Sequence, residues 1–311
     1  MYKWSLAIKT GIAFVSAIIL SFTYSAIAQP KSATITFTSD TQDPLFIERI
    51  IRKTDHNEKA TEMIFKDVVA LQPTGLFILG DVVSLGDKDA KWKKIDRYLQ
   101  WCSKANIPVY ATLGNHELMW SPKKGKQKFQ SRFPMHSPVG YFEISDSIAV
   151  ILLNSNFSHM TSEEITHQDD WYHKTIKEFD DDPAIKFIIV GCHHSPYTNS
   201  KVVAPSLPVQ AKFVPEFINS KKAVLFLSGH SHNFEQFKVG GKCFLVIGGG
   251  GGVHQPLNTK KQSTLDLSPY YKPMFHYLEV KRYGDSLTVI SRRLKPDFSG
   301  FENGLTFNVA L

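Results

Sequence analysis

The stretch Leu76-Phe77-Ile78-Leu79-Gly80-Asp81 decides the fold of this chain, because it is a short apolar run that ends in a glycine and then a carboxylate. A run of this length, bounded by turn residues, is typical of a buried strand in an α/β sheet. Such sheets bind ligands beyond the carboxyl ends of their strands, which is where Asp81 lies. A single aspartate there means little by itself, since aspartate is common in turns.

Four more apolar runs end in residue types that ligate metals. Residues 34–38 lead to Asp40 and Gln42, 108–113 to Gly114-Asn115-His116-Glu117, 187–192 to His193-His194, and 223–227 to Gly229-His230-Ser231-His232. Five strand ends that supply Asp, Asn and His predict one shared metal centre.

Helical periodicity alternates with these strands, and this order argues for right-handed βαβ units. Helices are predicted within 45–71 (clearest at 58–71) and at 90–104, 161–179 and 209–218, whereas 118–135 is polar and predicted to be irregular. A hairpin is predicted from 141–144 and 148–153. The last third alternates like antiparallel strands, at 234–239, 242–247, 275–280 and 286–292.

Five consecutive glycines, Gly248 to Gly252, follow one of these strands. A glycine run can cradle phosphate through its backbone N–H groups. This one lacks a following helix and a Lys-Ser/Thr pair, so it does not match a P-loop. We expect a tight loop near the site.

Residues 1–28 have the layout of a secretory signal peptide. Lys3 and Lys9 precede an apolar stretch without acids that closes with Ala26-Ile27-Ala28, an A-x-A cleavage pattern. The alternative is an uncleaved membrane anchor, because about eighteen apolar-leaning residues approach spanning length. Serine and threonine residues lower the hydrophobicity of this stretch, which favours cleavage before Gln29 over a membrane anchor. We therefore expect a single domain at 29–311 in an exported protein, either periplasmic or secreted. No later stretch is long and apolar enough to span a membrane.

The net charge limits the kinds of molecule that the protein can bind, and the cysteine content limits its disulfides and metal sites. The chain carries a net charge of +7, and without Lys3 and Lys9 about +5 remains. This mild basicity suits a small anionic substrate but falls short of the clustered charge of a nucleic-acid binder. The spacing of Cys102, Cys192 and Cys243 gives neither a zinc pattern nor a disulfide framework. We expect Cys192 and Cys243 to be small buried residues with free thiols, and the alternative is that two of the three cysteines form one disulfide.

The motifs at the strand ends suit catalysis by two metals. The imidazoles of His230 and His232 can reach adjacent cations if the turn splays them, and Gly229 lets the backbone bend there. Asn115 offers a neutral amide oxygen, and His116 can stay uncoordinated as a proton donor. The two oxygens of Asp81 can bridge cations. Two metals about 3.5–4 Å apart clamp an in-line displacement at phosphorus and generate hydroxide near neutral pH.

In the order D-x-Q, G-D, G-N-H-E, H-H-x-P and G-H-x-H, these motifs resemble the calcineurin-like metallophosphoesterase superfamily. The residues from Gly229 to Glu235 are similar to purple-acid-phosphatase-like members. The resemblance covers most of the chain after the leader. It implies an α/β fold, a four-layer α/β/β/α sandwich with two mixed β-sheets and a dinuclear site at one edge.

The resemblance also implies a role for each matching residue. His116 would protonate the leaving group, and Asn115 would stabilise charge on the substrate. His194, beside Ser195-Pro196, is either a substrate contact or a rival to His193 as a ligand. One metal would take Asp40, Asp81 and His232, and the other would take Asp81, Asn115, His193 and His230.

Two positions depart from the family pattern. The first motif usually reads D-x-H, and here it is Asp40-Thr41-Gln42, so Gln42 would ligate weakly or through water. Ser84 stands where purple members have tyrosine and serine/threonine phosphatases have aspartate. We therefore expect no purple colour, and Mn, Fe, Zn and Mg all suit the oxygen and imidazole ligands.

These features predict an exported enzyme with two metal ions that hydrolyses phosphate esters of small molecules by attack of metal-activated hydroxide. A phosphomonoesterase is favoured, and a phosphodiesterase or nucleotide pyrophosphohydrolase would use the same residues. A different class, a catalytically impaired binding or scaffold protein, is motivated by Gln42 and Ser84. Against it, such a protein would have no need of Asp81, Asn115 and His116.

Overall fold

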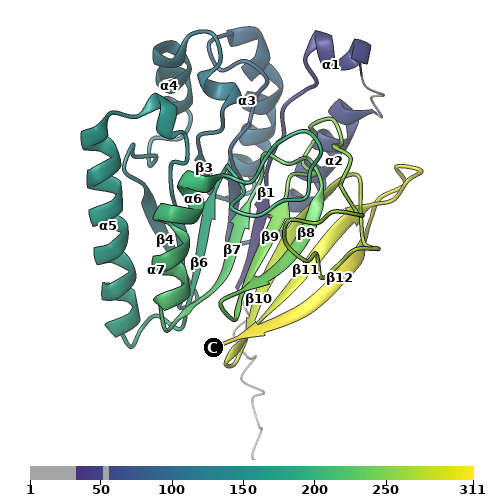
Figure 1. The fold of residues 1–311 in the computed structure, drawn as a ribbon. Helices are drawn as coiled ribbons and strands as arrows, with labels where there is room; N and C mark the ends of the chain where they lie inside the picture. The colour runs from purple at the N-terminus through teal and green to yellow at the C-terminus, as the bar shows by residue number, and fades with distance from the viewer. Residues whose placement is uncertain (1–32, 52–55) are drawn as a thin grey trace, which may run out of the picture. The chain divides into compact units, whose positions relative to one another are not determined.

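The computed structural model describes residues 33–51 and 56–311, and its strands form two six-stranded sheets. The first sheet has the order β12-β11-β10-β1-β2-β3 (Figure 1). In it, β1, β2 and β3 are parallel, and β10, β11 and β12 continue the sheet antiparallel. Their bounds are β1 (Thr34–Thr38), β2 (Gly75–Leu79), β3 (Val109–Thr112), β10 (His276–Tyr283), β11 (Ser286–Leu294) and β12 (Phe301–Ala310). The predicted leader, residues 1–28, lies outside the described residues.

The second sheet has the order β4-β5-β6-β7-β9-β8. Its inner strands β5, β6, β7 and β9 are parallel, and the edge strands β4 and β8 are antiparallel to their neighbours. The bounds are β4 (Tyr141–Ser145), β5 (Ile148–Leu152), β6 (Phe187–Cys192), β7 (Ala223–Ser228), β8 (Phe234–Val239) and β9 (Lys242–Ile247). Both sheets are therefore mixed.

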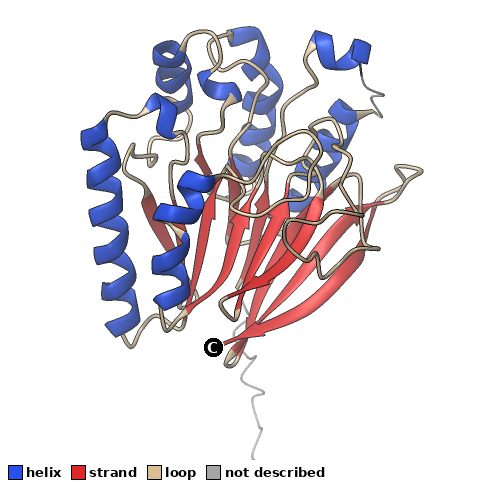
Figure 2. Ribbon diagram, in the orientation of Figure 1, coloured by secondary structure: helices blue, strands red, loops and turns tan. Residues whose placement is uncertain are grey.

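Except for the short first helix, the helices of the described chain pack on the outer faces of the two sheets (Figure 2). They are α1 (Phe46–Ile51), α2 (Asn57–Leu71), α3 (Asp89–Lys104), α4 (Pro122–Gln130), α5 (Ser162–Asp181), α6 (Leu207–Lys212) and α7 (Val214–Asn219), with short 3₁₀ turns η1 (His116–Leu118) and η2 (Phe157–His159). A reciprocal capping box between Thr161 and Glu164 starts α5. In the described part of the chain, no helix has the length and hydropathy needed to cross a membrane.

Three apolar clusters separate four layers. One cluster lies between the sheets and includes Phe37 and Leu79 from the first sheet and Leu152 and Leu227 from the second. A second packs α5, α6 and α7 on the outer face of the second sheet. The third packs α2, α3 and α4 on the outer face of the first sheet. The predicted four-layer α/β/β/α sandwich is confirmed.

Three local predictions were wrong. Residues 118–135 were expected to be irregular, but they contain α4, which buries only Gly125 and Phe129 and so shows little apolar periodicity. The single helix expected at 209–218 is two short helices that meet at Phe213, and α7 has proline in its first turn. The last strand, β12, was missed because its residues are at most half-buried. The three cysteines are free thiols, so the alternative of a disulfide is excluded.

Candidate metal centre

The carboxyl ends of β1, β2, β3, β6 and β7 meet at one edge of the sandwich, and backbone bonds join the loops that follow them. The Asp40 N–H donates to Gly80 O at 3.1 Å, and the Gly229 N–H donates to His193 O at 2.9 Å. Asp40, Asp81 and His230 all have positive φ, at 59°, 49° and 65°. Non-glycine residues rarely adopt this conformation, and such strain gathers at functional sites.

Asp40 and His232 form the first side of the site. Oδ1 of Asp40 lies 3.3 Å from Nε2 of His232, and both side chains are almost fully buried. The other ring nitrogen of His232, Nδ1, lies 2.8 Å from the carbonyl oxygen of Val253. A carbonyl can only accept, so Nδ1 carries the proton and Nε2 offers its lone pair to the site when the ring is neutral.

Gln42, which replaces the histidine of the family pattern, also faces this side. Its amide nitrogen donates to the backbone oxygens of Asp40 (3.1 Å) and Asp81 (2.8 Å), and this turns its oxygen toward His232 Nε2 at 3.3 Å. The opposite orientation would point the amide oxygen at two carbonyls, so the hydrogen-bond network assigns this one. Gln42 thus presents an oxygen lone pair where the family has an imidazole.

Asp81, Asn115 and His193 form the second side. Nε2 of His193 lies 3.4 Å from Asp81 Oδ2 and 3.0 Å from Asn115 Oδ1, while its Nδ1 donates to Leu79 O at 2.9 Å. Burial opposes the charged imidazole, but Asp81 and Asp40 outweigh it and raise the pKa of His193 to about 9. His193 and His116 hold the pKa of Asp81 well below its usual range, although burial opposes this. The carboxylates therefore favour positive charge here.

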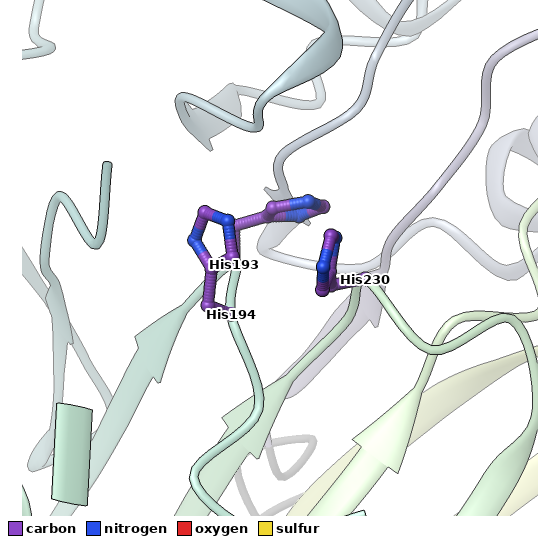
Figure 3. Close-up of side chains that lie close together, drawn as sticks. All are labelled: His193, His194 and His230. Atoms are coloured by element: carbon purple, nitrogen blue, oxygen red, sulfur yellow. The ribbon is translucent and has the colours of Figure 1, made fainter. Parts of the chain in front are cut away.

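Three imidazoles gather at this side: His193 and His194 follow β6, and His230 follows β7 (Figure 3). The His194 and His230 rings are 4.6 Å apart, and each lies about 5 Å from His193. Burial, together with His193, lowers the pKa of His194 to about 3 and that of His230 well below its usual value. Nδ1 of His194 lies 2.8 Å from Ser155 Oγ, so Ser155 fixes its ring.

His116, the expected proton donor, lies beside Asp81. Its Nδ1 donates to the backbone oxygen of Ser84 at 3.0 Å. Its other ring nitrogen, Nε2, lies 3.8 Å from Asp81 Oδ2 and is free of this hydrogen bond. The backbone N–H of His116 donates to Asp81 Oδ1 at 2.8 Å. The structure thus brings together every residue that the sequence predicted for the site.

The donor set fits divalent cations. The side chains of Asp40, Gln42, Asp81 and Asn115 supply oxygen, His193, His230 and His232 supply nitrogen, and none is a thiolate, a set that suits Mn, Fe, Zn or Mg. Ligand atoms of Asp40, Asp81 and His193 all lie within 4.8 Å of one another, and so do those of His193, His194 and His230. Each group could hold a cation, and His193, whose Nδ1 donates to Leu79 O, has one nitrogen to offer to either of them.

Glu117 is a site residue to which the sequence gave no role. It is fully buried, and its carboxylate accepts the backbone N–H groups of Asp81 (3.0 Å), Val83 (3.0 Å) and Gly114 (2.8 Å). Burial, and then repulsion from Asp81, raise the pKa of Glu117 to about 7. Glu117 joins the loops after β2 and β3 and so fixes the backbone of Asp81. Its place in the G-N-H-E motif was the only signal for this role.

The glycine run is a packing surface and not a phosphate cradle. The Gly250 N–H donates to Ser39 O at 2.9 Å, and the Gly252 N–H donates to Asp40 O at 2.8 Å. A Cβ on Gly252 would lie 2.6 Å from two ring atoms of His232. The run therefore lies directly against the loops that carry Asp40 and His232. This agrees with the prediction of a tight loop near the site.

Glu235 ties two of the site loops together and gives a pH-dependent prediction. Its buried carboxylate accepts the Thr198 hydroxyl at 2.6 Å and the Asn199 N–H at 2.7 Å. Burial raises the pKa of Glu235 to about 7, although these two hydrogen bonds oppose the rise. A carboxyl group whose pKa rises on folding stabilises the protein most at low pH, and this contribution is lost between the unfolded pKa and about pH 7.

Glu235→Gln should remove this dependence. Glutamine can accept the Asn199 N–H and donate to Thr198, whose hydroxyl can turn to Ser231 Oγ at 3.1 Å. Relative to wild type, the variant should gain roughly 2 kcal/mol in free energy of unfolding between pH 5 and pH 8. Urea unfolding at both pH values measures this, with exposed Glu178→Gln as the control. A difference between variant and wild type that stays constant with pH contradicts the prediction.

The sequence model for the calcineurin-like phosphoesterase family matches residues 33–234. The chain belongs to this family. Membership makes the protein a metal-dependent phosphoester hydrolase, as the motifs predicted. No curated protein matches the chain by sequence.

Solved structures share the fold at low sequence identity. A purple acid phosphatase from yellow lupin (Lupinus luteus) seeds superposes with a TM-score of 0.68 at 13% identity over 91% of this chain, which spans about half (54%) of the lupin chain. The anchor in the inner membrane complex of Plasmodium gives a TM-score of 0.64 at 14% identity, covering 90% of each chain. A dimetal phosphatase from Danio rerio gives 0.58 at 12% identity, covering 90% of this chain and 99% of that one. At these identities the likeness establishes the fold alone.

Proposed function

We propose that this phosphoesterase is an exported phosphomonoesterase that uses two metal ions. The observation that carries the proposal is the position of Asp81 between the two sides of the site. Its Oδ2 lies 3.3 Å from the Gln42 amide atom that faces it, which is the oxygen in the orientation assigned above, and 3.4 Å from His193 Nε2 on the other side. A carboxylate in this position can bridge two cations. The leader pattern of residues 1–28 supports export, and the resemblance of residues Gly229 to Glu235 to purple-acid-phosphatase-like members supports the preference for monoesters.

The residues of the chain divide the work in this proposal. Asp40, Gln42, Asp81 and His232 would hold one ion, and Asp81, Asn115, His193 and His230 the other. When bound, such ions polarise a phosphate ester and lower the pKa of water. The Asn115 amide would stabilise charge on the phosphate, His194 would contact its oxygens, and His116 would give its Nε2 proton to the leaving oxygen. A phosphodiesterase or pyrophosphohydrolase would use the same groups.

Turnover of an aryl phosphate monoester and the matching diester tests the proposal. Metal-stripped protein is assayed from pH 5 to pH 9 with Mn, Zn, Fe or Mg added back, and metal content is measured on the same samples. We expect metal-dependent monoester hydrolysis that falls at least about a hundredfold in Asp81→Ala. The control Asp89→Ala removes a carboxylate that is 77% exposed and should leave turnover unchanged.

The alternative, an impaired binding or scaffold protein, predicts a different result from these measurements. Gln42 and Ser84 motivate it, and a protein of similar fold is the anchor in the inner membrane complex of Plasmodium. Folded protein that binds well under about two ions per chain and turns over neither ester would support it. The next step would then be Gln42→His with Ser84→Asp, which restores the family residues.

A further inference from the structure

Trp120 is a large aromatic side chain that is exposed to solvent, on the loop that begins with the candidate residues Asn115 and His116. It is 81% exposed and follows His116 by four residues, just beyond η1. Tryptophan is normally largely buried, because its ring system contributes a large apolar area to the core. Trp120 contributes to none of the apolar clusters of this fold. Its exposure therefore calls for an explanation other than packing.

The backbone at Trp120 forms a strained turn. The Ser121 N–H donates to Met119 O at 2.8 Å, and Trp120 between them has a φ of 65°. This is a γ-turn with positive φ, which is rare in proteins. The same arrangement occurs at His230, with a φ of 65° and a 2.7 Å bond from Ser231 N–H to Gly229 O. There it carries a candidate metal ligand, so this fold already uses the turn to present a functional ring.

The chain on both sides of Trp120 is fixed. Before it, the buried Glu117 carboxylate holds three backbone N–H groups, and Leu118 is 1% exposed. After it, the Gly125 N–H donates to Ser121 O at 2.9 Å, and Gly125 packs so closely on Glu117 O that a Cβ there would clash. A strained turn persists only where its surroundings determine it. The indole therefore projects from a rigid base.

The chemistry at His116 decides what such a ring would meet. In the proposed reaction His116 gives its proton to the leaving oxygen, so the organic part of the substrate lies on the side of His116, and Trp120 is four residues farther along the same loop. We propose that Trp120 determines specificity by stacking on a planar ring of the alcohol that is released. The preferred substrates are then nucleoside or aryl phosphates, not alkyl phosphates. This inference rests on the proposed phosphomonoesterase function.

The reaction itself is an ordinary hydrolysis. The bond between phosphorus and the oxygen of the ring-bearing alcohol breaks, and a bond from phosphorus to a water oxygen forms. The proton from His116 ends on the alcohol, and the proton that the water loses goes to solvent, from which His116 takes up another. Trp120 touches only the alcohol, so it acts on binding of the ring in the ground state and transition state alike. Its removal should raise KM more than it lowers kcat.

Comparison of ring-bearing and ring-free substrates tests the proposal. Adenosine 5′-monophosphate and phenyl phosphate carry a ring, and glycerol 2-phosphate does not. For Trp120→Ala, kcat/KM should fall about tenfold for the two ring-bearing esters and stay within about twofold for glycerol 2-phosphate. Trp120→Phe keeps a ring on the same strained backbone and should retain most of the activity. If only one ring-bearing ester responds, the preference is narrowed to nucleoside or to aryl leaving groups.

Two results would overturn the inference: an equal fall for all three substrates, or no fall for either ring-bearing ester. A protein without any turnover would refute the proposed function separately. In that case, calorimetric binding of adenosine 5′-monophosphate to metal-loaded protein decides on Trp120. Binding about tenfold weaker in Trp120→Ala than in wild type supports the ring contact. Equal binding by the two, or no binding by either, contradicts it.

Discussion

Glu117→Ala should be among the most damaging single substitutions in this protein. It removes the acceptor of three buried backbone N–H groups, those of Asp81, Val83 and Gly114, at a position without solvent exposure. Each buried donor left unsatisfied costs about 1–3 kcal/mol. The free energy of unfolding should fall by roughly 3–5 kcal/mol, a large share of the total stability of a typical domain. Urea unfolding of the metal-free protein measures the loss.

A milder variant keeps this prediction testable if Glu117→Ala does not fold. Glu117→Gln has the same shape, but its amide has one oxygen for three N–H groups and turns its NH₂ group toward a donor. Its stability should fall by about 1–3 kcal/mol, and metal binding should weaken because the Asp81 backbone is less well fixed. The exposed substitution Glu178→Gln serves as the control. Equal stability of Glu117→Gln and wild type would show that the three bonds contribute nothing.

Gly252→Ala should separate metal binding from folding. The added methyl group would lie 2.6 Å from the His232 ring, closer than real contacts allow. The backbone cannot easily retreat, since Gly252 N–H donates to Asp40 O at 2.8 Å and Gly252 O accepts from Asn57 at 3.0 Å. The His232 imidazole must therefore shift from its place beside Asp40. We expect metal affinity to fall about 10–100-fold, the range seen when the partners that orient metal ligands are removed.

The matched control for this prediction is Gly75→Ala in β2. The nearest atom to a Cβ on Gly75 lies at 3.4 Å, an ordinary contact, so the substitution should leave metal affinity unchanged. Titration of stripped protein with Zn or Mn gives the affinity, and urea unfolding without metal shows whether the fold is intact. Wild-type affinity in Gly252→Ala would mean that His232 is not a ligand or that its loop yields.

The parts of the fold that could be predicted from the sequence are the strands that form continuous apolar runs. β2 and β7 are buried along their whole length, so their runs are continuous and their ends are sharp. β12 has no buried residue, and its Asn303-Gly304 pair looks like a turn although it lies inside the strand. α4 buries one glycine and one phenylalanine among lysines and glutamines, so neither composition nor periodicity distinguished it from a loop.

The site was predictable where strand ends carry ligand chemistry, as at Asp81, Asn115 and His230. The sequence did not reveal the groups that hold those ligands in place. Glu117 accepts hydrogen bonds from backbone N–H groups of other loops. Gly252 has no Cβ, and this leaves room for the His232 ring. Both effects depend on which segments meet in space, and single-sequence patterns do not report this. The orientation of Gln42 likewise follows from two carbonyls that become neighbours only in the folded chain.

The pairing of β1 with β10 has a consequence for the timing of folding. β1 carries Asp40 at its end, and its two neighbours are β2 and the much later β10, whose Leu278 to Lys281 pair with Phe37 to Thr34. All candidate ligands precede residue 233, so a nascent chain holds the complete set well before β10 has been made. Until then β1 is an unprotected edge, and closing it requires contacts of long sequence separation, which form slowly. Activity should therefore arise late in biosynthesis, once the C-terminal strands have joined the sheet.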